Sequence, residues 1–279
     1  MRSSKEIMDL ILSVASQDER VRVVAMNGSR TNPNASKDEF QDYDIVFLVT
    51  DMTSFLHDKS WVDVFGPRLI MQTPEDGRLM PPSLGGWYTY LMLFEDKNRI
   101  DLMLVPMSDL KRYLENDRLT MILLDKDQCV PALPVPSDET YWVKRPTLHQ
   151  FQGSCNEFWW LVPYVVKGIR RNEIIYAQHH LALLREEVLR QLAWLAGFAH
   201  DFHISAGKSY KNLEKYTDEK TWSFVMKSYA LGQADDCGRA LEILCDLFRK
   251  VAPKVAEAAG FTYLIQEEEN IMRYLKDVR

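Results

Sequence analysis

Gly28-Ser29-Arg30 and, after a short spacer, Asp42-Tyr43-Asp44-Ile45-Val46-Phe47-Leu48-Val49 carry the strongest structural signal in this chain. The second run is apolar after its acids, which is typical of a strand buried on both faces in a sheet. Because strand side chains alternate, Asp42 and Asp44 are expected on one face. Carboxylates at the solvated end of such a strand favour a divalent cation, and the small turn before them favours phosphate.

A third acid follows in a predicted hairpin. The runs 87–94 and 99–106 are typical of strands, and Glu95-Asp96-Lys97-Asn98 between them is typical of a turn. Hairpin pairing is expected to bring Asp101 into the same sheet as Asp42 and Asp44. The three acids are therefore candidate ligands of one or two Mg²⁺ ions, although an Asp-x-Asp pair at a strand start is more often a cap or a turn.

The rest of the pattern predicts two domains. The first, 1–136, is expected to be α/β or α+β, with a mixed sheet flanked by helices; the second, 137–279, is expected to be a helical bundle. The other elements predicted in the first domain are a helix capped by Ser4, strands at Val21–Met26, Leu69–Met71 and Met121–Leu124, and a helix at Met107–Leu114. The segment Val130–Pro136 is predicted to be a linker, because neither a helix nor a central strand tolerates prolines at this spacing. The later helices are predicted around Leu181–Leu195, Thr221–Leu231, Asp236–Ala258 and Glu267–Lys276.

Composition narrows the class of protein. Apolar residues make up 46% and charged residues 27%, as in an ordinary globular chain, and the net charge is −6. That charge disfavours a nucleic-acid binder and suits a polycationic small substrate. No apolar run of about eighteen residues predicts a membrane span. We expect a cytoplasmic monomer whose cysteines are buried, reduced thiols: Cys129, Cys155, Cys237 and Cys245.

A longer motif carries a family resemblance. The string Met26-Asn27-Gly28-Ser29-Arg30-Thr31-Asn32-Pro33-Asn34, with Gln41-Asp42-Tyr43-Asp44-Ile45-Val46 after it and Asp101 on a later strand, resembles the nucleotidyltransferase superfamily of the DNA polymerase β type. Within it the string is similar to the aminoglycoside 6-adenylyltransferases, which inactivate streptomycin by transferring AMP from ATP. The likeness runs over nearly the whole chain, including the aromatic run Phe158-Trp159-Trp160.

This resemblance, together with the chemistry of the residues, assigns roles in the first domain. Asp42 and Asp44 are expected to bind Mg²⁺, and Asp101 to be the third ligand, the general base that takes a proton from the acceptor hydroxyl, or both. Gly28 and Ser29 are expected to donate to the ATP phosphates. Arg30 is expected either to bind a phosphate or to form an ion pair within its own domain.

The second domain and the hairpin supply further candidates. The resemblance implies that Lys208 or Lys211 reaches the ATP phosphates, with a solvated lysine face as the alternative. The two guanidinium groups of streptomycin require carboxylates, for which the candidates are Glu95, Glu157 and Asp201. Trp87 and Tyr88 are candidates for stacking on a guanidinium, or else they only pack. The aromatic cluster Trp159, Trp160 and Tyr164 is expected to be core.

The expected reaction is therefore ATP plus streptomycin giving adenylyl-streptomycin and pyrophosphate. The partners are ATP and the aminoglycoside, without nucleic acid or membrane. Two alternatives remain. One is adenylylation of another small molecule, such as a lincosamide, or of a protein hydroxyl. The other is a non-catalytic, antitoxin-like binding module that keeps the fold.

Overall fold

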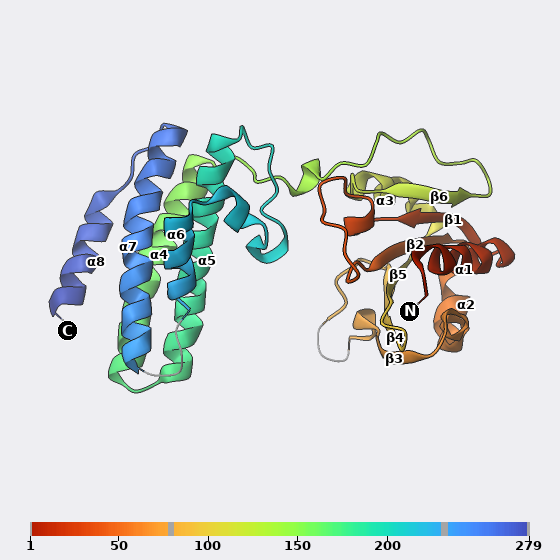
Figure 1. Cartoon of the computed structure of the whole chain (residues 1–279), viewed down its shortest axis with the longest axis horizontal. Helices are drawn as coiled ribbons and strands as arrows, with labels where there is room; N and C mark the ends of the chain where they lie inside the picture. Colours follow the sequence, from red (N-terminus) through yellow and green to blue (C-terminus); the bar gives the residue numbers. More distant parts are fainter. Residues whose placement is uncertain (1, 78–80, 230–233, 278–279) are drawn as a thin grey trace. The chain divides into compact units, whose positions relative to one another are not determined.

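A computed structural model describes residues 2–77, 81–229 and 234–277. It divides the chain into two compact units, Met1–Thr140 and Tyr141–Arg279, each with its own apolar core. The boundary predicted after residue 136 falls slightly before this division. The expected fold class is confirmed: a mixed sheet with helices in the first unit, and helices in the second (Figure 1).

The first unit is built on a six-stranded sheet with the order β3-β4-β5-β2-β1-β6. Only β2 and β5 run parallel to each other, and the other neighbouring strands are antiparallel. The parallel pair therefore begins at one edge of the sheet, so residues near the start of β2 and β5 lie side by side. The strands are β1 Val21–Met26, β2 Tyr43–Val49, β3 Arg68–Gln72, β4 Tyr88–Phe94, β5 Arg99–Pro106 and β6 Met121–Asp125.

Helix α1 (Ser4–Gln17) covers one face of this sheet. Its Ile7 and Ile11 are fully buried in the same apolar layer as Tyr43 and Phe47 of β2. The helix is capped by Ser3 and not by Ser4, because the Ser3 side chain accepts from the Glu6 backbone and Glu6 bonds back in a capping box. A short helix, α2 (Met52–His57), follows β2.

The opposite face carries a smaller apolar cluster. Val46 and Leu48 of β2 pack there with Trp87 and with Tyr113 of helix α3. The helix predicted from Met107 begins as a 3₁₀ turn, Met107–Asp109, and continues as α3, Leu110–Asn116. The two faces of β2 are thus both covered, as its unbroken apolar run predicted.

The second unit contains the helices α4 Leu148–Arg170, α5 Ile174–Ala199, α6 Glu219–Lys227, α7 Ala234–Ala259 and α8 Ile265–Asp277. Helices α4, α5 and α7 run alongside one another (Figure 1), and Phe158 of α4 stacks on Phe248 of α7 at 3.9 Å between ring centroids. The helix predicted to reach Leu231 ends at Lys227, where Ser228 caps it, and Leu231 itself lies outside the described residues.

Two expectations about burial need correction. Cys129 is exposed, although the other three cysteines are buried and all four are free thiols. Trp159 is core at 2% exposure, but its neighbour Trp160 is 63% exposed because it lies on the solvent side of α4. Along the described ranges, we find no helix that is both long and apolar enough to cross a membrane.

Candidate active site

Two of the predicted acids meet on neighbouring strands. The parallel register of β2 and β5 pairs Asp44 directly with Asp101. Both side chains belong to the face that also carries Val46 and Val105, since the alternate residues of each strand pack under α1. The sheet topology therefore produces the convergence of carboxylates that the sequence predicted for these positions.

Asp42 and an unexpected residue, Arg99, complete this group. The Arg99 guanidinium donates from Nε to Asp101 Oδ1 at 2.8 Å and from Nη2 to Asp101 Oδ2 at 2.7 Å. The same Nε lies 3.6 Å from Asp42 Oδ2. Sequence reasoning missed Arg99, although its spacing of two from Asp101 on a strand places both side chains on one face.

Asp44 has an unfavourable electrostatic environment. Burial raises the pKa of Asp44 to about 6, and the negative charges of Asp101 and Asp42 contribute in the same direction. Arg99 partly opposes this effect. A half-buried carboxylate beside two other acids is a position that a divalent cation stabilises.

Gly28 fits closely against Asp44. It begins the 3₁₀ turn η1, Gly28–Arg30, with φ +72°, in the left-handed region that favours glycine. A Cβ at this position would lie 2.0 Å from Asp44 Oδ2. The backbone N–H of Asn27 also donates to the Asp44 carbonyl at 2.9 Å. The turn is thus held directly over the start of β2, and only glycine allows this approach.

A network of buried and partly buried side chains from α3 and the chain after it supports the turn. Tyr113 Oη donates to Asn27 Oδ1 at 2.6 Å, and Asn27 Nδ2 donates to Thr120 Oγ1 at 2.8 Å. Thr31 Oγ1 lies 2.8 Å from the carbonyl oxygen of Leu119, to which it donates. None of these partners was predicted, because their contacts join segments far apart in the sequence.

Arg30 is used inside its own unit. Its guanidinium lies 3.7 Å from the centre of the Tyr43 ring and donates to the carbonyls of Asp42 at 2.9 Å and Gln41 at 2.8 Å. The observed contacts match the intradomain alternative, in hydrogen-bonded form, more closely than phosphate binding. Ser29 is next to it in η1, and its carbonyl accepts from Gln41 Nε2 at 3.2 Å.

The side chains of Trp87 and Tyr88 are packed inside the first unit and are largely inaccessible to a substrate. Each is 6% exposed. Trp87 Nε1 donates to Asp109 Oδ2 at 2.8 Å, and Tyr88 Oη donates to Asp76 Oδ1 at 2.9 Å. These contacts favour the packing alternative over stacking on a substrate, because little of either ring is accessible.

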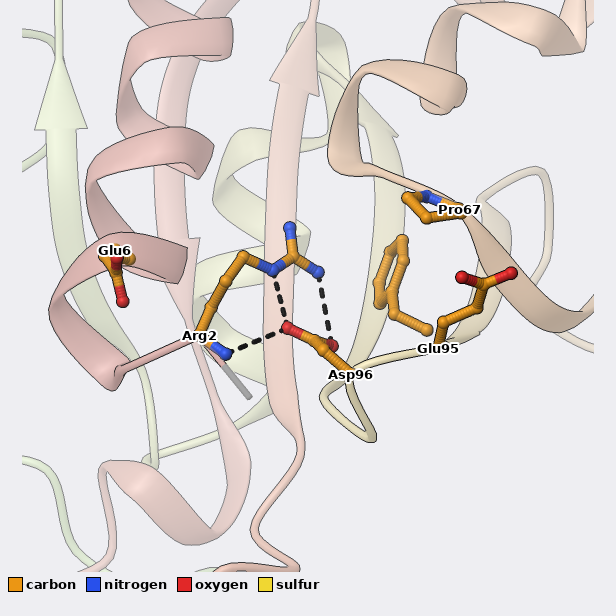
Figure 2. A pocket seen from close by; sticks show the side chains of 6 residues that line it. Arg2, Glu6, Pro67, Glu95 and Asp96 are labelled. Atoms are coloured by element: carbon orange, nitrogen blue, oxygen red, sulfur yellow. Dashed lines mark hydrogen bonds and ion pairs between the residues drawn. The ribbon is translucent and has the colours of Figure 1, made fainter.

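Glu95 lies at a pocket on the α1 side of the sheet. The pocket has a volume of about 600 Å³ and is lined by Arg2, Glu6, Pro67, Phe94, Glu95 and Asp96. Arg2 Nε pairs with Asp96 at 2.7 Å, and Figure 2 shows the Glu95 carboxylate directed away from that pair. Phe94 belongs to the apolar layer under α1. The structure therefore does not bring Glu95 to the face that carries Asp44 and Asp101.

The remaining candidates belong to the second unit. Lys208 begins a short 3₁₀ turn and Lys211 follows it; Glu157 is on α4, and Asp201 follows α5 with φ 51°. All four residues are exposed. Their predicted contacts with ATP or the acceptor stay predictions.

The donor set fits Mg²⁺ in kind. Asp42, Asp44 and Asp101 offer the carboxylate oxygens that this ion prefers. The pKa of Asp44 is raised first by burial and then by the negative charges of Asp101 and Asp42, which a cation would offset. Within residues 2–77, 81–229 and 234–277, however, no three His, Cys, Asp or Glu side chains already form a metal-binding cluster. Arg99 donates to both oxygens of Asp101, so a metal ion at this carboxylate would either share these oxygens with the guanidinium or displace it.

A glycine turn packed against paired strand acids in a mixed sheet, followed by a helical unit, defines a nucleotidyltransferase-like protein. A family model described as streptomycin adenylyltransferase matches residues 1–278, and the chain belongs to that family. It is an adenylyltransferase by class.

Full-length relatives agree. The chain is 42% identical over 280 residues to an aminoglycoside 6-adenylyltransferase of Bacillus subtilis (strain 168). This alignment covers 100% of this chain and 98% of the relative. It is 43% identical over 270 residues to one of Campylobacter jejuni, covering 96% and 93%. It also aligns with a crystal structure of an aminoglycoside 6-adenyltransferase from Bacillus subtilis at 38% identity, with a TM-score of 0.49, over 100% of this chain and 99% of that one.

Proposed function

We propose that this protein transfers AMP from ATP to a hydroxyl group of an aminoglycoside, with streptomycin as the foremost acceptor, and so inactivates the antibiotic. The family and the names of the full-length relatives support the aminoglycoside class. The observation that carries the chemistry is the pairing of Asp44 with Asp101 beneath Gly28. A non-catalytic, antitoxin-like role finds no support, because the chain belongs to an enzyme family.

The reaction is a displacement at the α-phosphorus of ATP. The acceptor oxygen forms a bond to this phosphorus, the bond to the leaving pyrophosphate breaks, and the acceptor proton passes to a base. Asp101 is the proposed base and also a metal ligand, together with Asp42 and Asp44. A bound Mg²⁺ supplies charge neutralisation on the triphosphate. Catalysis otherwise depends on positioning by the protein.

The turn after β1 is the proposed phosphate site. The backbone N–H groups of Gly28 and Ser29 and the Ser29 hydroxyl are donors of the kind that phosphate oxygens require. Tyr113 and Asn27 hold this turn in place, and Arg30 holds the chain that enters β2. In this proposal Arg30 positions the chain that carries Asp42 and does not contact the phosphates itself.

The second unit is proposed to supply the remaining substrate contacts. Lys208 and Lys211 are the candidates for ATP, and Glu157 and Asp201 for the acceptor; all are exposed. The net charge of −6 favours approach of a polycationic acceptor. A cytoplasmic location and a monomeric state also stay predictions.

Mass spectrometry of the products tests the acceptor class. The protein is incubated with Mg-ATP and, separately, streptomycin, other aminoglycosides and a lincosamide. We expect streptomycin to gain the mass of one adenylyl group. Modification of another acceptor instead would keep the transfer chemistry and replace the substrate. Absence of an adenylylated product with every acceptor would overturn the proposed function.

A further inference from the structure

One guanidinium group offsets part of the negative charge of the proposed metal site. Arg99 and Asp101 are separated by one residue on β5, and their side chains form a bidentate pair at 2.8 and 2.7 Å. Arg99 Nε also lies 3.6 Å from Asp42 Oδ2. When all three acids are ionised they carry −3 against the +1 of Arg99, and the charge of Asp117 also acts on Asp44.

The pair also disfavours a cation at the Asp101 carboxylate. Both oxygens of Asp101 accept from Arg99, and the Asp101 side chain is only 17% exposed. Each oxygen keeps a second lone pair, but a metal ion that binds there lies close to the positive charge of the guanidinium, which opposes the cation. The Arg99 side chain, in contrast, is 44% exposed, so it has room to leave Asp101 without disturbing the core.

We propose that Arg99 is an exchangeable counter-ion: it holds Asp101 and Asp42 while the site is empty of metal, yields Asp101 to the metal, and then binds a phosphate group of the nucleotide. This inference rests on the proposed function. Carboxylate and phosphate are alternative bidentate partners of the same planar guanidinium, so the exchange replaces one pair of hydrogen bonds by an equivalent pair. Arg99 is thus a substrate-contacting residue of the loaded site.

A fixed structural ion pair is the opposing interpretation. In that case Arg99 aligns Asp101 for the metal, and its removal weakens metal binding. In an exchange, its removal frees Asp101 and adds one net negative charge, so that metal binds more tightly. The two interpretations therefore predict opposite changes in one measurable affinity.

Metal affinity is measured with Mn²⁺ by electron paramagnetic resonance on the full chain without nucleotide. We expect Arg99→Gln to bind Mn²⁺ roughly fivefold more tightly than wild type, as expected from the loss of a charge-assisted competitor. Arg99→Lys is also expected to bind Mn²⁺ more tightly, because an ammonium group does not hold both oxygens as a guanidinium does. Equal or weaker Mn²⁺ binding in either variant would overturn the exchange.

Nucleotide affinity is measured calorimetrically with Mg²⁺ and α,β-methylene-ATP, an analogue that cannot transfer AMP. Here Arg99→Gln is expected to bind about fivefold more weakly, because a phosphate contact is lost. Tighter Mn²⁺ binding with unchanged nucleotide binding would overturn the second half of the exchange. Arg22→Gln is the matched control. Arg22 of β1 makes a comparable pair with Asp127, and it lies at the end of β1 that pairs with Val49, away from Asp44. This control is expected to change neither affinity.

One more variant separates this inference from the proposed function. Asp44→Asn is expected to lose Mn²⁺ binding if the acids hold the metal. If it does, while Arg99→Gln leaves Mn²⁺ affinity unchanged, only the role of Arg99 is wrong. If Asp44→Asn and wild type bind Mn²⁺ equally, the metal site of the proposed function fails, and the inference fails with it.

Discussion

At the scale of single residues, the ionised carboxylate of Asp44 lowers the stability of the metal-free protein. Burial and the neighbouring charges of Asp101 and Asp42 raise its pKa from 3.8 to about 6. The folded protein therefore binds a proton at Asp44 more tightly than the unfolded chain does. Between these two pKa values the free energy of unfolding falls as pH rises, and above about pH 6 the full cost of the ionised carboxylate is present.

Asp44→Asn is accordingly expected to stabilise the metal-free protein at pH 8, by about 1–2 kcal/mol after allowance for partial exposure. The gain should shrink as pH falls through 6 and disappear below about pH 4, where the carboxyl group is protonated in both states. Urea unfolding at several pH values measures this. The control is Glu257→Gln on the exposed side of α7, which should show no such gain. Destabilisation by Asp44→Asn at pH 8 would contradict the account.

Gly28→Ala tests the close contact between η1 and Asp44. A Cβ at Gly28 meets Asp44 Oδ2 at 2.0 Å, and φ is +72°. We expect a loss of about 1–2 kcal/mol in stability and at least about a tenfold loss in kcat/KM, because the carboxylate is displaced. Gly153→Ala is the control, since Gly153 is in α4 with open space around it. It should stabilise the protein slightly and leave activity unchanged.

At the scale of elements, helix α3 supports the turn that follows β1. Tyr113→Phe removes the hydroxyl that donates to Asn27 at 2.6 Å. We expect about a tenfold loss in kcat/KM for ATP and about 1 kcal/mol in stability. Tyr90→Phe is the matched control, because Tyr90 is fully buried and donates to the Phe55 carbonyl at 3.0 Å on the other face of the sheet.

That control should lose similar stability and keep its activity. If Tyr113→Phe also keeps full kcat/KM, the turn does not depend on α3. Steady-state kinetics with ATP as the varied substrate, paired with thermal unfolding of both variants, distinguishes the two outcomes.

The elements themselves were largely predictable, whereas their side-chain partners were not. The apolar run after Asp44 identified β2, and the turn at Glu95 identified the β4–β5 hairpin, because both signals are local. The helix start was misplaced by one residue, since Ser3 and Ser4 are both able to cap and only the back-bond from Glu6 selects Ser3. The pairs Arg99–Asp101 and Tyr113–Asn27 depend on side-chain geometry that the pattern of residue types does not specify.

At the scale of the whole molecule, the chain has two units with separate apolar cores. The proposed metal ligands all belong to the first unit. The family resemblance covered both units, but the sequence alone does not distinguish the candidates of the second unit, Lys208, Lys211, Glu157 and Asp201, from ordinary exposed surface residues. Trp87 and Tyr88 were candidates for stacking on a substrate, but both are packed, as aromatic residues at a strand start more often are.

Phe248→Ala tests the separation of the cores. Phe248 is fully buried and stacks on Phe158 at 3.9 Å, so its truncation should cost the second unit about 3–5 kcal/mol. Mn²⁺ binding by the first unit at 20 °C should remain at the wild-type level, and calorimetric unfolding should show one earlier transition. Loss of Mn²⁺ binding at a temperature where the first unit is folded would contradict this expectation.

The central claim is that the acids on β2 and β5 perform metal-dependent AMP transfer. Its most direct test is pyrophosphate release from Mg-ATP, with and without streptomycin, by wild type and Asp44→Asn. The account predicts streptomycin-dependent release by the wild type, loss of that release on chelation of Mg²⁺, and a decrease of at least about a hundredfold in Asp44→Asn. Release that is equally fast in folded Asp44→Asn would contradict the claim.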